Sequence, residues 1–231
     1  MRLLLDAGAD PNDGQALYNT GAPVEVLELL FSYGLGQKKG GPWLERIGNR
    51  YGRDQMLQWE LWRAARSNQL DKVKLLVEHS VDVNQPTTGH NRTLYQEARL
   101  AGHDEIADYL TAHGAKQIEL EEKERFESAC NGGRREEALA ILQKNPKLLE
   151  QLGEQRRSEI VHSAASSGRA EAVRILAELG FDLNAMVSSR TPMHDAAWRN
   201  DVEMIRLLLE LGADPAIQDG AYGGTPLGWA E

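Results

Sequence analysis

The sequence has little of several residue types, and each shortage excludes a class of protein. It has one cysteine in 231 residues, so no disulfide can form within the chain, as is usual in a reducing compartment. No apolar run approaches the ~18 residues of a membrane-spanning helix. Basic residues number 26 against 35 acidic ones, and the formal charge of -9 disfavours nucleic acid and anionic membranes as partners. We therefore expect a cytoplasmic protein that binds neither nucleic acid nor a membrane.

The segment from Arg190 to Pro215, RTPMHDAAWRNDVEMIRLLLELGADP, predicts two short helices joined by a tight turn. The first begins after Thr191, whose hydroxyl can accept a hydrogen bond from the first turn. Pro192 suits the next position, because the N–H that it lacks would have had no partner there. Ala197 and the alanine before it keep this helix thin, so that a neighbouring helix can approach closely.

A second helix is expected from about Val202, after a break at Asn200-Asp201. Four apolar side chains share one stripe of such a helix, which we expect to be its buried face: Val202, Ile205, Leu208 and Leu209. Gly212 can adopt the left-handed conformation that ends a helix, and the Asp-Pro after Ala213 turns the chain away. The whole unit spans about 33 residues, a period typical of helical repeats.

The same helix ending and turn recur along the chain. Turn residues are expected at Gly8, Gly34, Ser80, Gly114, Gly180 and Gly212, with a diverged turn at Asn145-Pro146. Two short helices cannot bury their apolar faces alone, so such a unit is stable only when it is stacked on copies of itself. The interval from Gly34 to Ser80 is longer than the others and predicts an insertion at about 35–57.

These motifs resemble those of ankyrin repeats. The stretch TPMHDAA is similar to the Thr-Pro-Leu-His-x-Ala-Ala signature of that family, and LLLELGADP is similar to its second-helix ending. The resemblance implies an all-α fold, an ankyrin-repeat solenoid of stacked helix-turn-helix units with hairpin-like loops. It covers residues 1–231 as a single array of about six to seven repeats, and both ends are expected to lie within a repeat, as in a fragment. The insertion resembles one of bacterial ankyrin proteins, and either packs as an elbow or binds.

The resemblance also assigns residues to the frame that holds repeats together. In the family, the signature histidine hydrogen-bonds the threonine and nearby backbone, and so ties adjacent repeats. His194 has this place, and His162 has it in the preceding repeat, where Glu159 replaces the threonine and the bond must differ. The expected frame residues are Thr191, Pro192, His194, Ala197, Gly212 and His162.

Catalysis and metal binding have little support in the sequence. The histidines are scattered and give no close pair at helical ligand spacing with a second pair behind it. Cys130 could act as a nucleophile with His162 or Glu127, but it aligns with Ser166 and Trp198, just after the alanines of a first helix. A small packing residue is the simpler interpretation. No glycine-rich phosphate loop follows a strand. We expect no catalytic residue, no cofactor and no metal, and hence no enzyme.

Binding of a protein partner is the remaining interpretation. In the family, first helices line the concave side and loops project as tips, where side chains are free to vary. The partner-binding candidates are Arg66, Ser67, Arg99, Trp198, Arg199 and Tyr222. Trp198, Arg199 and Tyr222 are the preferred anchor, because Trp, Tyr and Arg dominate binding hot spots. The alternative for Trp198 is that it packs against a neighbouring first helix.

Three loop tips are further candidates, at Thr87–His90, Met186–Ser188 and Asp219–Tyr222. We expect the chain to be a monomer that binds a protein. Two functions stay open: a non-catalytic scaffold, and a regulatory or targeting segment of a longer enzyme or effector.

Overall fold

The fold is entirely helical in every part of the chain that the structure describes. This computed structural model describes residues 1–13, 17, 23–37, 53–85 and 92–230, and no strand forms among them. The chain divides into two compact units, the first made of Met1–Arg99 and His103–Glu119, the second of Leu100–Gly102 and Leu120–Glu231. No described helix is both long enough and apolar enough to cross a membrane. The prediction of an all-α fold is confirmed.

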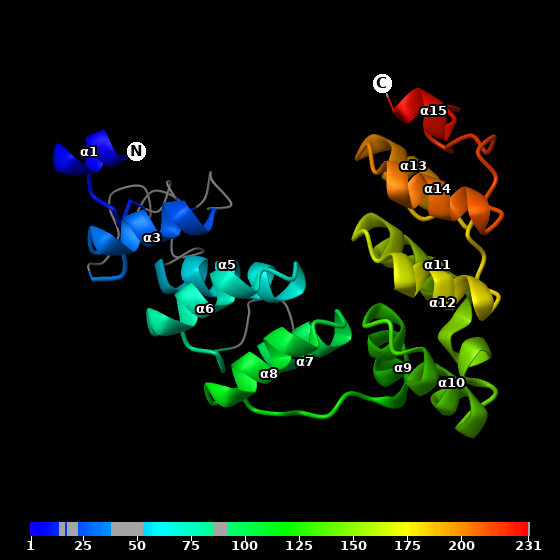
Figure 1. The fold of residues 1–231 in the computed structure, drawn as a ribbon, viewed down its shortest axis with the longest axis horizontal. Helices are drawn as coiled ribbons and strands as arrows, with labels where there is room; N and C mark the ends of the chain where they lie inside the picture. Colours follow the sequence, from blue (N-terminus) through cyan, green and yellow to red (C-terminus); the bar gives the residue numbers. More distant parts are fainter. Residues whose placement is uncertain (14–16, 18–22, 38–52, 86–91, 231) are drawn as a thin grey trace. The chain divides into compact units, whose positions relative to one another are not determined.

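The described part of the first unit is built from short helices (Figure 1). Its described helices are α1 (Arg2–Asp6), α3 (Val24–Ser32), α5 (Arg53–Arg66), α6 (Leu70–Glu78), α7 (Leu94–Leu100, whose last residue belongs to the second unit) and α8 (Asp104–Ala112). Helices α5 and α6 pack against each other as one repeat, and α6 also contacts α3 and α8. The core of this unit centres on fully buried Leu27, Leu61, Leu76 and Ile106.

The second unit repeats the same helix pair (Figure 1). Its helices are α9 (Glu122–Asn131), α10 (Arg135–Lys144), α11 (Leu148–Ser166), α12 (Ala170–Glu178), α13 (Pro192–Trp198), α14 (Val202–Glu210) and α15 (Pro226–Trp229). The first helices α11, α13 and α15 pack on one another in series. The alanine pairs Ala164–Ala165 and Ala196–Ala197 are buried where these helices meet, which explains why the sequence keeps them small.

The recurring turns adopt the conformation that the sequence predicts. All six predicted turn residues have a positive φ: 91° at Gly8, 93° at Gly34, 64° at Ser80, 88° at Gly114, 77° at Gly180 and 90° at Gly212. The residue after each turn closes it, as where the N–H of Ala213 donates to the carbonyl of Leu208 over 2.9 Å. The diverged turn differs, because Asn145 has a φ of -130°.

The buried face of α14 differs from the stripe that the sequence suggests. Met204, Leu207 and Leu208 are buried, whereas Val202 and Leu209 are 46% and 45% exposed. This helix is apolar at most of its positions, so two stripes were compatible with its sequence. The stripe that faces α13 is selected by the turn at Asn200, whose φ of 53° fixes how the second helix leaves the first.

The predicted insertion at 35–57 is too long at its C-terminal end. Helix α5 begins at Arg53, and Met56 and Leu57 are buried in the core of the first unit. Leu35 is buried in that core as well. The apolar residues Met56, Leu57 and Leu61 recur at helical spacing, and this periodicity continues α5 towards its N-terminus, into the predicted insertion. The middle of the predicted insertion, 38–52, lies outside the described residues.

Candidate functional site

The frame of the second unit is held by His194 and Thr191. His194 is fully buried. Its Nδ1 accepts hydrogen bonds from the backbone N–H of Thr191 (3.2 Å) and from the Thr191 hydroxyl (2.8 Å). Because Nδ1 accepts, the proton is on Nε2, which donates to the carbonyl oxygen of Gly224 at 3.1 Å. The imidazole therefore joins the start of α13 to the loop that precedes α15.

His162 makes the same connection one repeat earlier, with a different partner on its other nitrogen. Its Nε2 lies 2.9 Å from the carbonyl oxygen of Ala185, in the loop before α13. Its Nδ1 lies 3.1 Å from a carboxylate oxygen of Asp195 on α13, in place of the threonine that this repeat lacks. Both histidines thus bond forward to the next repeat.

Asp195 is the acidic centre of this contact. Its other oxygen accepts from the guanidinium of Arg190. Burial pushes the pKa of the Asp195 carboxyl upwards, but the hydrogen bonds from His162 and Arg190 outweigh it, and the pKa is lowered overall. Asp195 is therefore a carboxylate at neutral pH. Its role is in the frame, and this role was not predicted, because its partner His162 lies one repeat away along the chain.

The preferred binding residues lie outside this frame and are open to solvent. Trp198 is 71% exposed at the end of α13, and the next residue, Arg199, is exposed as well. Tyr222, in the loop before α15, is 88% exposed. The Trp198 ring also contacts the Trp229 ring of α15 edge to face, with the ring centres 5.9 Å apart. Trp198 thus touches the neighbouring first helix while most of its surface stays open.

Asp219 organises the loop that carries Tyr222. One of its oxygens accepts from the backbone N–H groups of Ala221 (2.8 Å) and Tyr222 (2.6 Å), and the other from Gly224 N–H (2.8 Å) and the indole N–H of Trp229 (3.1 Å). These bonds, that of Tyr222 foremost, lower the pKa of the Asp219 carboxyl to about 2. The sequence suggested Asp219 only as part of a loop tip, but an Asp before Gly is a common signal for such a turn.

The three binding candidates of the first unit differ in their exposure and in their ion pairs. Arg66 is exposed, its guanidinium lies 4.8 Å from the Trp62 ring centre, and it pairs with buried Glu97 at 3.6 Å. Ser67, next to it, is exposed. Arg99 is half-buried and pairs with Asp104 at 2.6 Å within its own repeat. The nearby carboxylate therefore holds the Arg99 guanidinium.

Of the remaining two candidate loop tips, one lies among the described residues. Met186 is 46% exposed, and the loop around it forms one antiparallel bridge between Val187 and Arg190, the hairpin-like loop that the sequence predicts. The candidate tip at Thr87–His90 lies outside the described residues.

Cys130 is placed as a packing residue. It is fully buried in the core of the second unit. Burial, together with the charge of Glu127, raises the pKa of its thiol to about 12, so the reactive thiolate is scarce at neutral pH. The Glu127 carboxylate is held by the guanidinium of Arg156, on the next first helix. Within the described ranges, no three His, Cys, Asp or Glu side chains gather as metal ligands would.

Three comparisons with known proteins place the sequence beside others. Residues 126–219 match a family model described as ankyrin repeats (3 copies). No curated protein matches the sequence. Among solved structures, the chain is similar to the human ASB11 ankyrin repeat domain, with 24% sequence identity and a TM-score of 0.40, over 90% of this chain and 87% of that one. The family match includes both frame histidines, His162 and His194, together with Trp198 and Arg199.

Proposed function

We propose that the chain is an ankyrin-repeat protein, as the family match over residues 126–219 indicates, and that it binds a partner protein, without catalysis, through the Trp198 end of α13 and the Tyr222 loop. Ankyrin repeats are generally protein–protein interaction modules and are typically non-catalytic. The proposal adds the surface that does the binding and the residues on it.

One observation carries the proposal: the side chain of Trp198 is exposed although no contact of the frame requires it to be. The frame contacts of α13 are made by Thr191, His194 and Asp195, all of them buried or half-buried. Trp198 stands beyond them with 71% of its surface open. Burial of a large exposed aromatic side chain against a partner is favourable. The adjacent arginine adds a second residue type that is common in binding hot spots.

A ring contact and hydrogen bonds connect the Tyr222 loop to Trp198. The indole ring of Trp229 contacts Trp198 on one side and donates a hydrogen bond to Asp219 on the other. Asp219 in turn fixes the backbone N–H of Tyr222 at 2.6 Å. A partner that covers Trp198 and Tyr222 would therefore meet a loop backbone that is already held in place, which limits the entropy lost on binding.

The charge of the chain supports a protein as the partner. The formal charge of -9 opposes nucleic acid and anionic lipid, and we infer a monomer that works in the cytoplasm.

Affinity capture tests the proposal. The wild-type chain is used to isolate and identify a partner, and the partner's affinity is then measured for the double variant Trp198→Ala, Arg199→Ala. We expect a loss of about 2 kcal/mol or more in binding free energy. The control removes a Trp–Arg pair of the first unit, Trp59 (50% exposed) and half-buried Arg63, whose guanidinium lies 4.8 Å from the Trp59 ring centre. An equal loss in both double variants would contradict the proposed surface.

A further inference from the structure

The two frame histidines have the same place in successive repeats, but their hydrogen-bond partners are of opposite kinds. His194 Nδ1 accepts from two donors, the backbone N–H and the hydroxyl of Thr191, so its proton is on Nε2. His162 instead meets an acceptor at each nitrogen. Its Nδ1 lies 3.1 Å from a carboxylate oxygen of Asp195, and its Nε2 lies 2.9 Å from the carbonyl oxygen of Ala185. The two imidazoles therefore need different numbers of protons.

A neutral imidazole cannot satisfy both partners of His162. It has one N–H donor and one bare nitrogen that accepts, whereas an imidazolium has two donors. A backbone carbonyl has no proton to give, and the Asp195 carboxyl has none at neutral pH, because its hydrogen bonds outweigh its burial and lower its pKa. In the neutral ring, one lone pair would point at an acceptor in a site where the His162 side chain is only 8% exposed. Both ring nitrogens therefore carry a proton.

We propose that His162 is a charged imidazolium held between Asp195 and the Ala185 carbonyl, and that its charge makes this contact between α11 and α13 a pH-sensitive joint. As the pH rises, one ring N–H bond breaks and the proton passes to water. The neutral ring keeps one of its two hydrogen bonds, and the other acceptor loses its donor. The joint belongs to the chain alone, so it does not depend on the partner proposed above.

The pH dependence of the joint has a definite sign. In the unfolded chain, a histidine titrates near its ordinary pKa of about 6.5. Because the folded chain favours the charged form of His162, the joint contributes its full stability below that value and loses it as the pH rises further. His194 has the opposite sign. A proton on its Nδ1 would break both bonds from Thr191, so its contribution is full above the ordinary value and is lost as the pH falls.

The charged groups on the elements around His162 are engaged in pairs. Helix α11 packs against α9, α12 and α13. The pairs on these helices and on the loop before α13 are Arg156 with Glu127 and Glu159, Glu171 with Arg174, and Arg190 with Asp195. Carboxylates and guanidinium groups keep their charge at the pH where histidine titrates. Cys130 of α9 stays neutral there, because burial raises the pKa of its thiol to about 12. Among these groups and the two histidines, only the histidines change charge in that range.

Nuclear magnetic resonance of the full chain, labelled with ¹⁵N, counts the protons on each ring. A neutral imidazole has one bare nitrogen, whose resonance lies far from that of the protonated nitrogen, whereas the two nitrogens of an imidazolium resonate close together. At neutral pH we expect the imidazolium pattern for His162 and a bare Nδ1 for His194. The wild-type spectrum thus decides the charge of His162 without any variant.

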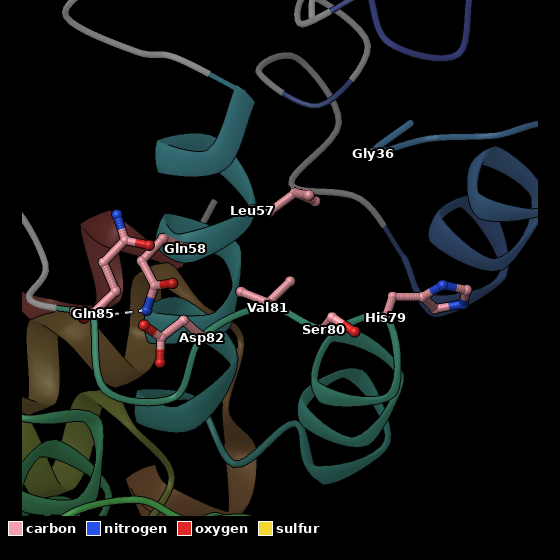
Figure 2. A pocket seen from close by; sticks show the side chains of 8 residues that line it. All are labelled: Gly36, Leu57, Gln58, His79, Ser80, Val81, Asp82 and Gln85. Carbon is pink, nitrogen blue, oxygen red and sulfur yellow. Dashed lines mark hydrogen bonds between the residues drawn. The ribbon is translucent and has the colours of Figure 1, made fainter. Parts of the chain in front are cut away.

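His79 provides a reference histidine outside the frame. It is exposed at the edge of a pocket in the first unit, where its ring stacks on Phe31 with the ring centres 3.8 Å apart. Figure 2 shows this ring pointing away from Asp82, the carboxylate that lines the same pocket. Its resonances therefore show how an exposed ring responds to pH in the same sample.

The variant Asp195→Asn should make the neutral ring the better fit. The amide oxygen of this variant can still accept from Arg190, and its NH₂ group can donate to Nδ1 of His162. The ring then needs a proton only on Nε2, for the Ala185 carbonyl. We therefore expect Asp195→Asn to give His162 a bare Nδ1 at neutral pH.

The matched control is Glu159→Gln. It removes a carboxylate on α11 itself, about one turn before His162, where Glu159 bonds to Arg156. The charge of the chain changes by the same amount as in Asp195→Asn, but the joint keeps both of its acceptors. We expect His162 to stay charged in this control. Circular dichroism checks that both variants keep their helices.

Urea unfolding at a series of pH values measures how far the charge holds the repeats together. The quantity compared is the ratio of the folding equilibrium constants of wild type and Asp195→Asn. His194 contributes to both proteins alike, so the ratio isolates His162. We expect it to fall about tenfold between pH 6 and pH 8, the equivalent of one pH unit in the titration of a single group. The corresponding ratio for Glu159→Gln should stay constant over this range.

Several results would overturn the inference. A bare nitrogen on His162 in the wild-type chain at neutral pH would mean that the ring is neutral despite its two acceptors. A charged His162 in Asp195→Asn, or a neutral one in Glu159→Gln, would show that the joint does not determine the charge. A charged His162 with a ratio that does not vary with pH would show that the charge leaves the contact between the repeats unchanged.

Discussion

Replacement of His194 by alanine is the sharpest test of the frame. The imidazole is fully buried and makes three hydrogen bonds, two to Thr191 and one to the carbonyl of Gly224. Its ring also meets the ring of Trp229 edge to face, with the ring centres 5.6 Å apart. Alanine removes all of these interactions at once.

The expected loss of stability follows from the groups that lose a partner when the imidazole of His194 is removed. The backbone N–H of Thr191 is buried and loses its acceptor, at a cost of about 1–3 kcal/mol. The Gly224 carbonyl is only partly buried, so water can replace its donor at a smaller cost. The aromatic contact with Trp229 adds about 0.5–1.5 kcal/mol. Together we expect the free energy of unfolding of the second unit to fall by about 3 kcal/mol.

Urea unfolding, followed by tryptophan fluorescence and circular dichroism in parallel, measures this loss. The control is His113→Ala, because His113 is exposed and its hydrogen bond and ring contact are both with Tyr109 in its own helix end. We expect the control to change stability by no more than about 1 kcal/mol. If His194→Ala were as mild as His113→Ala, the histidine would not tie the repeats, and the account of the frame would be refuted.

Three further predictions concern a turn, the thiol and a loop. Gly212→Val should cost at least about 2 kcal/mol of stability, because Gly212 has a φ of 90° and the added Cβ would meet nothing, so the cost is in the backbone alone. Ser80→Gly, at the equivalent turn position with a φ of 64°, should stabilise its unit by up to about 1 kcal/mol. Urea titrations of the two variants should therefore show changes in stability of opposite sign. Cys130, with its thiol pKa raised to about 12, should resist iodoacetamide in the native chain at pH 8 and react after unfolding, which mass spectrometry measures; native labelling as fast as that of the unfolded chain would contradict its burial. The pKa of Asp219 is lowered to about 2, so its stabilisation is complete above the ordinary pKa near 4 and is lost as the pH falls through the lower value; thermal melting of Asp219→Asn should vary less than that of the wild type over this range, and identical pH profiles would refute the role.

Local chemistry is what made much of the fold predictable from sequence. The turn at Gly212 and the helix start at Thr191 depend on residues within a few positions of each other, and the structure has both. The bond between His194 and Thr191 is also local, at a separation of three residues. The exposure of Trp198 follows from its place just beyond the buried alanines.

Contacts between repeats could not be predicted in the same way. The partner of His162 is Asp195, and that of Arg156 is Glu127, each about one repeat away in the chain and with no local signal. The face of α14 was ambiguous because its sequence offers two apolar stripes.

The central claim is that the frame and the binding surface are separate, and one paired measurement tests it. The free energy of unfolding and the affinity for the captured partner are measured for His194→Ala and for the double variant Trp198→Ala, Arg199→Ala. The account predicts that the double variant loses about 2 kcal/mol or more of binding free energy and no more than about 1.5 kcal/mol of stability, the contact with Trp229. His194→Ala should lose stability and keep its affinity at temperatures where it stays folded. A double variant that unfolds more easily by several kcal/mol yet binds normally would contradict the claim and make Trp198 a structural residue.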